Sequence, residues 1–589
     1  MAATQPRYRP ELERSRWLSV ILLAGLVLIF LRLFQIQVLK HDYYVAEVGP
    51  RLESRYAAPA PQPGSILART GEPLAESLLL DTLFADPLFM ARHERRESPQ
   101  GVAQQLAPLI GRSAEDILTD LTQRQDTNYV ELARCVPHDV SNQIRALRIK
   151  GLGLKPEWKR EYPHGILACH LLGGRDKSHN ALSGLEYRYR LLLDGNPGAN
   201  LPSQDPLGLD NAESQRVGDA PGKDLLLTIH PDLQRQVERE MDVLWRRENP
   251  KWTACVVEDV TTGGILAMAA RPGYDPNDYV RGKRAAGCKW SVVPENVTRN
   301  IPVTEAIEQG STFKILLATA ALEAGVVVPS STFHCGGTIN MGGRPISCWG
   351  EWGSKGHGNL DVSGMLAQSC NVCAAQIAVK LGAKRYGDFL RKVGIGIDPE
   401  AGFSAEAKGR LKPAEGMRKR DLGTMGFGQN VSCSGLQLTS IVSGIVNDGI
   451  MKHPHILAAA LNRDGTVFRK TVVSEKRICS PQTSATIRKM LENTVENGTG
   501  KPVKMPDFRV GGKTGTAQQW DPKLGRYTDR YMMSFIEVAP IEAPRYVIWV
   551  ACSDPKVGRH GSDTAAPAAK HIAEYALRQL TPPQPQPAP

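Results

Sequence analysis

The chain has 589 residues, with 41% hydrophobic and 23% charged residues, ordinary values that exclude a largely disordered chain and a coiled coil. This length predicts two or three domains. The formal net charge of +11 is modest and no block of lysine and arginine stands out, so we expect no nucleic-acid partner. A protein beside anionic lipid or an anionic wall polymer fits the same charge.

The N-terminus carries an apolar segment behind a basic tail. Residues 17–31 have no charged side chain, and after Arg32 an apolar face continues to Leu39. A membrane span needs about 20 residues, and residues 17–39 supply them if the Arg32 side chain reaches toward the interface. Arginines outnumber acids in residues 1–16, so we expect a cytoplasmic tail and an uncleaved anchor, with the rest of the chain outside the cytoplasm. A cleaved signal peptide is the alternative, but no cleavage-site pattern follows the segment.

Residues 40–220 contain no cluster of acids, histidines or phosphate-binding glycines, and we interpret them as a structural or docking module. A proline-rich linker occupies residues 58–64, and helices are expected near 98–125 and 139–149. The Pro/Gln-rich residues 581–589 are expected to be disordered.

Residues 221–580 alternate strand and helix signals in an order typical of an α+β domain with a central antiparallel sheet flanked by helices. The expected strands are 224–229, 254–259, 265–269, 508–517, 532–539 and 546–552, and the expected helices are 231–247, 313–323, 361–382, 384–393, 435–447 and 565–580. Three short motifs fall within this region, and they supply its chemistry.

The first motif, S-x-x-K, runs from Ser311 to Lys314 at the expected start of a helix. The Ser311 N–H should be among the unpaired donors of the first helical turn. Lys314 projects from the same face three residues on, so its amine can reach the Ser311 hydroxyl. An uncharged lysine activates the serine as a nucleophile, and burial or a second cation nearby would lower the lysine pKa in that direction.

The second motif, S-x-N, is Ser369-Cys370-Asn371, which follows the expected helix 361–368. The side chains of residues 369 and 371 point the same way from an extended or turn segment. Ser369 can then relay a proton while the Asn371 amide holds substrate and orients the lysine.

The third motif, Lys513-Thr514-Gly515, continues into Thr516 within an apolar-flanked strand. Gly515 allows another backbone to approach, which suits a peptide added along the strand edge. Lys513 and Thr514 would attract the terminal carboxylate of that peptide, and the N–H groups of Thr516 and Ser311 would form an oxyanion hole. A solvated lysine in a hairpin is the alternative, but it does not account for the glycines before the motif.

Each motif alone is a weak signal, because a chain of this length contains about one or two S-x-x-K strings by chance. Ser553 and Lys556 form such a string, which an internal proline and its position after the K-T-G disqualify. Ser178 and Asn180 form an S-x-N upstream of the first motif, so their order disqualifies them.

Eleven cysteines leave at least one unpaired in an oxidising compartment. Cys335 and Cys348 flank a glycine-rich stretch and are the best disulfide candidates. Cys370 and Cys373 have a redox or metal-ligand spacing, but no second pair or nearby histidine pair completes a zinc site, so we interpret them as small buried helix residues. No metal or other cofactor is expected.

The three motifs in this order resemble those of penicillin-binding proteins and serine β-lactamases. The resemblance is to the transpeptidase domain of class B penicillin-binding proteins over roughly residues 222–580, with further matching strings at Thr261–Met268, Tyr274–Asn277, Gly426–Gly428, Gln437-Leu438, Gly498–Gly500, Lys513–Gln518, Ser534-Phe535 and Ala565–Pro567. Upstream, Gly184–Glu186 and Leu193–Gly195 resemble the non-catalytic pedestal of that family. Two departures are the loss of an arginine and an aspartate from a family motif at residues 63–71, which leaves pedestal geometry open, and Gln309 in place of a common proline.

The resemblance implies an α+β, serine β-lactamase-like transpeptidase fold with an N-terminal anchor and an elongated pedestal. It also implies a peptidoglycan D,D-transpeptidase in which Ser311 attacks the penultimate D-alanine carbonyl of a stem peptide, and which β-lactams trap. The implied catalytic residues are Ser311, Lys314, Ser369, Asn371 and Lys513, and the implied substrate-binding residues are Thr514, Gly515 and Thr516.

Several alternatives remain open. A carboxypeptidase or β-lactamase would pass the acyl group to water, and a non-catalytic β-lactam-binding scaffold would keep the pocket without turnover. Residues 369–372 with 381–383 resemble the septal, cell-division group, which we favour, whereas Cys335 and Cys348-Trp349 with residues 356–358 resemble the elongation group. The family implies a polytopic glycosyltransferase partner, other divisome or elongasome proteins, and a single-pass protein of the cytoplasmic membrane with a periplasmic or extracytoplasmic catalytic domain.

Overall fold

The computed structural model describes residues 10–40, 61–92, 98–124, 127–176, 178–195, 221–278, 297–343, 345–521 and 523–580. The expected disordered tail at residues 581–589 and the start of the linker at 58–60 lie outside these ranges. The chain divides into two compact units, Met1–Ala60 with Leu79–Trp158 and Pro61–Leu78 with Lys159–Pro589.

The first unit contains the N-terminal apolar helix α1 (Pro10–Phe34), which continues as a π-helical turn over Gln35–Leu39. The 23 residues Trp17–Leu39 are long and apolar enough to cross a membrane, the one such segment in the described part of the chain. Nearly all its large apolar side chains are exposed, as expected of a segment that faces lipid. The segment coincides with the expected anchor at 17–39.

The rest of the first unit is a small α/β module. Its elements are the second part of β2 (Pro73–Ala85), α3 (Pro87–Arg92), α4 (Pro99–Ile110), α5 (Ala114–Gln123), β3 (Val130–Val136), α6 (His138–Ala146) and most of β4 (Leu152–Glu161). Ser98 and Ser113 cap α4 and α5 by accepting a hydrogen bond from a backbone N–H of the first turn. The helices bury Leu106 and Ile117 in a core of their own, so the expected helices near 98–125 and 139–149 are confirmed.

The second unit is built on a five-stranded antiparallel sheet of order β16-β17-β18-β6-β7. Its strands are β6 (Trp252–Asp259), β7 (Ile265–Arg271), β16 (Gly511–Asp521), β17 (Arg526–Ala539) and β18 (Tyr546–Ser553). Successive side chains of β18 enter different cores, with Val547 and Trp549 on one face of the sheet and Ile548 and Val550 on the other. Both faces must therefore be covered, and helices cover them.

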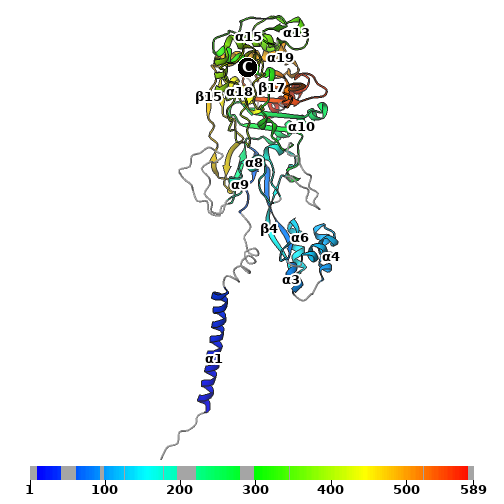
Figure 1. Cartoon of the computed structure of the whole chain (residues 1–589), viewed down its shortest axis with the longest axis vertical. Helices are drawn as coiled ribbons and strands as arrows, with labels where there is room; N and C mark the ends of the chain where they lie inside the picture. The colour runs from blue at the N-terminus through cyan, green and yellow to red at the C-terminus, as the bar shows by residue number, and fades with distance from the viewer. Residues whose placement is uncertain are drawn as a thin grey trace, which may run out of the picture. The chain divides into compact units, whose positions relative to one another are not determined.

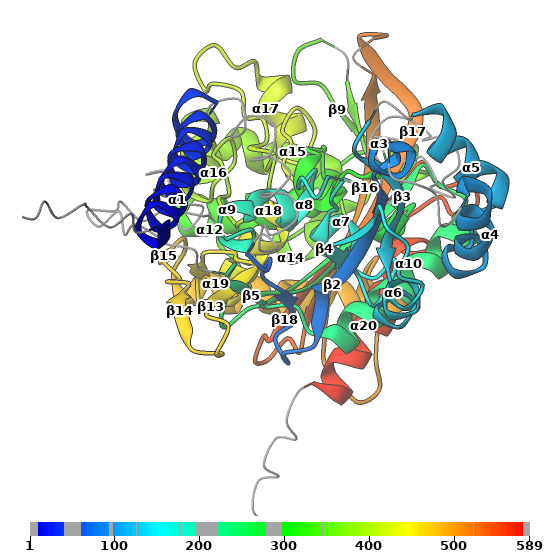
Figure 2. The same cartoon turned by 90° about the horizontal axis from the view of Figure 1, so that it is seen from below.

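Two helices, α10 (Pro231–Glu248) and α20 (Ala565–Gln579), pack on one face and on each other, as Figure 2 shows from below. On the other face lies α18 (Gly435–Val446), which is buried along its whole length and contacts β6 and β18 (Figure 1). Against α18 pack α12 (Lys314–Glu323) and α19 (Pro481–Asn497), and against α12 pack α14 (Val362–Ala367), α15 (Asn371–Leu381) and α16 (Ala383–Lys392). The expected α+β class, with a central antiparallel sheet flanked by helices, is confirmed.

One expected strand belongs to a different sheet. β5 (Asp224–Leu227) pairs in parallel with β1 (Ile66–Leu67) and antiparallel with β13 (Leu457–Leu461), rather than with the central sheet. That second sheet also holds β14 (Val467–Lys470) and the first part of β2. The apolar alternation of β5 buries Leu225 and Leu227, but it carries no information about which strands pair with it.

The segment that departs from the family motif, residues 63–71, is bonded by Arg160, which belongs to a small buried network of polar and charged side chains. Arg160 donates to the Gly64 carbonyl at 2.6 Å, to Ser77 Oγ at 3.0 Å and to Glu186 at 2.6 Å. Arg175 binds the other oxygen of Glu186 at 2.6 Å. Burial alone would raise the pKa of Glu186, but the two arginines outweigh it and hold the pKa below its usual value. This segment therefore retains an arginine hydrogen bond, although the arginine of the family motif is missing.

The remaining elements are short. They are α7 (Cys169–Leu172), α8 (Gly184–Arg188), α9 (Arg190–Leu193), α11 (Ile301–Thr304), β8 (Phe333–Cys335), β9 (Thr338–Ile339), β10 (Ile346–Ser347), α13 (Trp352–Lys355), β11 (Gly358–Leu360), α17 (Lys419–Met425), β12 (Ile450–Lys452) and β15 (Glu475–Arg477), with 3-10 turns at Pro276–Asp278, Gly310–Phe313 and Lys501–Val503.

Candidate active site

Ser311 lies in a 3-10 turn, Gly310–Phe313, that leads directly into α12. The residue before this turn, Gln309, is buried and bonds on both sides of its amide, donating to the Cys433 carbonyl at 3.1 Å and accepting from Trp549 Nε1 at 3.2 Å. Gly310 has a φ of +58°, and a Cβ there would lie 2.6 Å from the Thr516 carbonyl oxygen. The two Gln309 hydrogen bonds fix the start of the turn that carries Ser311, and Gly310 allows this turn to lie close to strand β16.

The Lys314 amine is fully buried and surrounded by oxygen atoms. Its Nζ lies 3.0 Å from Ser311 Oγ, 2.6 Å from the Ser369 carbonyl oxygen and 2.8 Å from Asn371 Oδ1. The last two atoms can only accept hydrogen bonds, so they occupy both N–H groups of an uncharged amine and leave its lone pair for the Ser311 hydroxyl. Burial lowers the pKa of Lys314 to about 8, which makes that uncharged form accessible near neutral pH.

Ser369 adopts a left-handed backbone conformation, with φ +54°. It follows the last turn of α14, where the Cys370 N–H bonds the Met365 carbonyl, the pattern of a Schellman C-cap in which glycine is usual. This conformation holds Ser369 Oγ 2.9 Å from Lys513 Nζ and 3.3 Å from Lys314 Nζ. The expected helix 361–382 is therefore interrupted at the S-x-N motif.

Strand β16 carries the third motif and forms an edge of the sheet, because β17 is its one neighbour among the described strands. Lys513 is fully buried and donates to Thr514 Oγ1 at 3.2 Å. Two causes place the pKa of Lys513 well below its usual value: burial is the larger, and repulsion from the charge of Lys314 is the smaller. Thr514 Oγ1 also lies 2.9 Å from Thr499 Oγ1, whereas Thr516 is exposed.

Gly515 packs against groups of the chain itself. A Cβ at this position would lie 2.2 Å from Ser534 Oγ and 3.0 Å from the Gln309 carbonyl oxygen. Gly515 and Ser534 are paired across β16 and β17. The absence of a side chain here therefore lets the turn that carries Ser311 lie directly on the sheet, whereas the motif alone predicted room for a substrate backbone.

A cleft of about 800 Å³ opens over these groups, and Ser311, Ser369, Asn371, Thr514 and Thr516 line it. Sequence reasoning missed several of its walls, namely Trp349, Phe427, Thr499, Tyr531 and His560. The glycine-flanked strings at 426–428 and 498–500 were a usable signal for Phe427 and Thr499. Trp349 and His560 contact edge to face across more than 200 residues, with ring centroids 6.0 Å apart, so no local pattern announced them.

The two disqualified strings, Ser553 to Lys556 and Ser178 to Asn180, are decoy motifs whose side chains or backbone groups bond residues outside the candidate site. Ser553 Oγ accepts from Gln519 at 2.7 Å, and Lys556 pairs with Asp554 at 2.6 Å rather than with the serine. The upstream string at Ser178 forms a turn around Asp176.

The disulfide expected between Cys335 and Cys348 is wrong for this structure. Both residues are free thiols, and each sulfur faces the Nδ1 atom of His357, at 3.6 Å and 3.5 Å respectively. The sequence separation of the two cysteines did not indicate that a histidine would lie between them.

A half-buried serine that lines a cleft and contacts a fully buried lysine, beside the edge strand of an antiparallel sheet, defines a serine acyltransferase class of site. Residues 253–574 match the penicillin binding protein transpeptidase domain, and residues 59–227 match the penicillin-binding protein dimerisation domain. The chain belongs to the class B penicillin-binding proteins.

Curated relatives agree with this assignment. The stage V sporulation protein D of Bacillus subtilis is 30% identical over 88% of this chain and 78% of its own length. The peptidoglycan D,D-transpeptidase FtsI of Escherichia coli is 27% identical over 98% of this chain and 95% of its own length. A crystal structure of penicillin-binding protein 3 of Mycobacterium tuberculosis with ampicillin has a TM-score of 0.66 and 26% identity, covering 90% of this chain and 98% of that one. Together with the apolar helix at Trp17–Leu39, these relatives indicate a membrane-anchored protein.

Proposed function

We propose that this chain cross-links peptidoglycan stem peptides through an acyl intermediate on Ser311. Ser311 Oγ attacks the carbonyl of the penultimate D-alanine, the peptide bond to the terminal D-alanine breaks, and that D-alanine leaves. The amine of a neighbouring stem peptide then attacks the ester, forms the cross-link and restores the Ser311 hydroxyl. The observation that carries the proposal is the 3.0 Å contact between Ser311 Oγ and the buried Lys314 amine.

The proton has a defined route in this scheme. Lys314 accepts it from Ser311 during attack, and the leaving amine needs a proton as the peptide bond breaks. Ser369 Oγ lies within 3.3 Å of Lys314 and 2.9 Å of Lys513, which supports its role as the relay. Asn371 keeps Lys314 oriented through the 2.8 Å hydrogen bond to its amide oxygen.

The substrate would lie along the free edge of β16. Backbone groups of this edge can pair with an extended stem peptide, and the N–H groups of Thr516 and Ser311 would hold the oxyanion. The terminal carboxylate would be bound by Thr514, Thr499 and Lys513. The hydroxyl oxygens of Thr514 and Thr499 are 2.9 Å apart. A β-lactam carries a carboxylate and a strained acyl group in comparable positions and would acylate the same serine.

Two other functions use the same site. A D,D-carboxypeptidase or β-lactamase would hydrolyse the acyl group, but no convincing E-x-x-x-N string follows the S-x-N motif to hold the water, and the anchor and pedestal would serve no purpose. A non-catalytic scaffold would keep the cleft without turnover. The name of the FtsI relative and the completeness of the site favour a transpeptidase.

The wider setting is also part of the proposal. Residues 1–16 would form a cytoplasmic tail, 17–39 a single membrane span, 40–220 the pedestal, 221–580 the transpeptidase domain outside the cytoplasm and 581–589 a disordered tail. The arginine excess before the span supports this orientation. We favour septal synthesis with a polytopic glycosyltransferase and divisome proteins as partners, the elongation machinery being the alternative.

Labelling with a fluorescent penicillin tests the proposal. We expect the wild-type protein in detergent or membranes to form a stable adduct and Ser311→Ala to form none, while Ser553→Ala, the decoy serine, labels normally. A label that is lost rapidly would favour a hydrolase. Donor and acceptor stem peptides should then yield cross-linked dimers with release of D-alanine, and stable labelling without dimers would favour the scaffold.

A further inference from the structure

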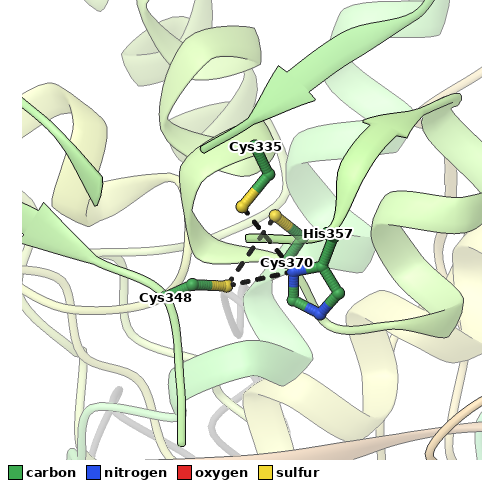
Figure 3. A group of neighbouring side chains, drawn as sticks. All are labelled: Cys335, Cys348, His357 and Cys370. Carbon is green, nitrogen blue, oxygen red and sulfur yellow. Dashed lines mark hydrogen bonds between the residues drawn. The ribbon is translucent and has the colours of Figure 1, made fainter. Parts of the chain in front are cut away.

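Three cysteines and a histidine converge beside the active site, as Figure 3 shows. Cys335 ends β8, Cys348 follows β10, His357 precedes β11 and Cys370 is the N-cap of α15. The three sulfur atoms and a ring nitrogen of the histidine all lie within 4.8 Å of one another. The three cysteines are buried, and none is in a disulfide.

Three of the six separations between the four ligand atoms match tetrahedral coordination of one metal ion, and all six are within 4.8 Å. A tetrahedral zinc ion with Zn–S bonds of about 2.3 Å and Zn–N bonds of about 2.0–2.1 Å places two sulfurs about 3.8 Å apart, and a sulfur and a nitrogen about 3.6 Å apart. Cys348 Sγ and Cys370 Sγ are 3.8 Å apart. His357 Nδ1 is 3.6 Å from Cys335 Sγ and 3.5 Å from Cys348 Sγ. These separations are far longer than a disulfide bond of about 2.05 Å.

The surroundings orient the histidine for this role. The His357 ring stacks on Trp352, with centroids 4.5 Å apart and planes 21° apart, and Nδ1 is the ring nitrogen that faces the sulfurs (Figure 3). Cys335 is paired with Gly358 across β8 and β11, so the strand pairing places the first cysteine beside the histidine. Cys348 lines the catalytic cleft, which offers an ion a route to the cluster.

We propose that Cys335, Cys348, His357 and Cys370 form a structural Zn²⁺ site. Three sulfurs and one imidazole nitrogen are a donor set of structural zinc, whereas Mg²⁺ and Ca²⁺ require oxygen ligands. Four protein ligands leave no open position, so the ion has a structural rather than a catalytic role. The sequence predicts no metal because Cys370 and Cys373 lack a second pair or a nearby histidine pair. In the structure Cys373 is not part of the cluster, and its sulfur contacts the Phe333 carbonyl at 3.5 Å.

The site would connect segments that the sheet and helices leave separate. Cys370 is the middle residue of the S-x-N motif, so its sulfur binds the ion while Ser369 and Asn371 on either side contact Lys314. The other ligands come from the short strands at 333–360. Zinc would therefore hold the S-x-N motif against these strands, and the site is a positioning device for the neighbouring catalytic groups.

The test is metal binding by the full-length protein in detergent. We expect about one zinc per chain after dialysis, measured by mass spectrometry of the eluted metal. After chelation under reducing conditions, Co²⁺ should give the thiolate charge-transfer band and the intense visible bands of a tetrahedral ion. Cys335→Ser and His357→Ala should each weaken zinc binding at least about tenfold, while Cys479→Ser, a buried cysteine outside the cluster, should bind zinc as the wild type does.

A second readout does not depend on the variants folding well. Chelating the wild-type protein should lower its thermal unfolding midpoint and slow its acylation by penicillin, and added Zn²⁺ should restore both. Zinc binding should persist in Ser311→Ala, so the site stands or falls separately from the transpeptidase proposal. Zinc content no higher than in the cluster variants, an octahedral cobalt spectrum, or a disulfide among these cysteines in the purified protein would overturn the inference.

Discussion

The Ser369 hydroxyl lies 2.9 Å from the amine of Lys513, although 144 residues separate them in the chain. The same hydroxyl is 3.3 Å from Lys314, so it joins the lysine beside the nucleophile to the lysine of the edge strand. A proton can therefore pass between the two sides of the cleft without crossing open solvent. Two predictions concern Ser369 and Lys314, a third concerns the packing of Gly515, and a fourth concerns a buried carboxyl group elsewhere in the sheet.

Removing the Ser369 hydroxyl should slow acylation while leaving the nucleophile in place. We expect Ser369→Ala to lower the rate of penicillin acylation by about 10² or more, as is typical when a general acid–base group is lost. Ser369→Gly should be equally slow but more stable than Ser369→Ala by about 1–2 kcal/mol, because φ is +54° at this position. Stopped-flow acylation and urea unfolding of both variants check this, and normal acylation in either would contradict the relay.

Acylation should depend on pH through the Lys314 amine. Burial lowers the pKa of Lys314 to about 8, and only the uncharged amine can accept the Ser311 proton. The acylation rate should therefore rise about tenfold per pH unit at low pH and level off above about pH 8. The same profile is expected for Lys556→Ala, which changes the decoy lysine. A rate that is flat between pH 6 and pH 9 would argue against Lys314 as the base.

Adding a methyl group at Gly515 should disturb both stability and acylation. The Cβ of Gly515→Ala would meet Ser534 Oγ at 2.2 Å and the Gln309 carbonyl at 3.0 Å. We expect a loss of about 1–3 kcal/mol in unfolding free energy, typical of overpacking, and slower acylation because the nucleophile turn must shift. Ser534→Ala removes the nearer atom, so the double variant should recover part of the stability. No recovery would place the strain at the Gln309 carbonyl.

Stability should fall as pH rises because of a buried carboxyl group on β6. Burial raises the pKa of Glu258 to about 8 from 4.5, and this effect outweighs the hydrogen bonds from Ser440, at 2.5 Å, and Ser443, which lower the pKa. Between pH 4.5 and about pH 8 the unfolded chain gives up this proton while the folded protein keeps it. Unfolding free energy should therefore decrease by up to about 1.4 kcal/mol per pH unit in this window.

Glu258→Gln tests that prediction, because the amide keeps the size of the side chain and cannot ionise. Its unfolding free energy should decline less steeply with pH than that of the wild type. Glu415→Gln, at an exposed position, should retain the wild-type slope. Equal slopes in all three proteins would show that Glu258 does not retain its proton in the folded state.

Much of the fold followed from local patterns. The strand expected at 546–552 is Tyr546–Ser553, and the helix expected at 231–247 is Pro231–Glu248. Both could be predicted because the spacing of apolar residues that marks a strand or a helix is a local property of the sequence. The break at Ser369 was missed, since a serine in left-handed conformation has no marker in the sequence. The partners of β5 were missed because they lie more than 150 residues away on either side.

By itself, the sequence determined the three motifs and the family, because each motif is a contiguous string of three or four residues. Only the tertiary structure decided that Lys314 is buried against Ser369 and Asn371, that Gly515 makes room for the turn that carries Ser311, and that Cys370 lies close to His357. These relationships join segments separated by 13 to about 200 residues, and backbone pairing and core packing, rather than local periodicity, bring such segments together.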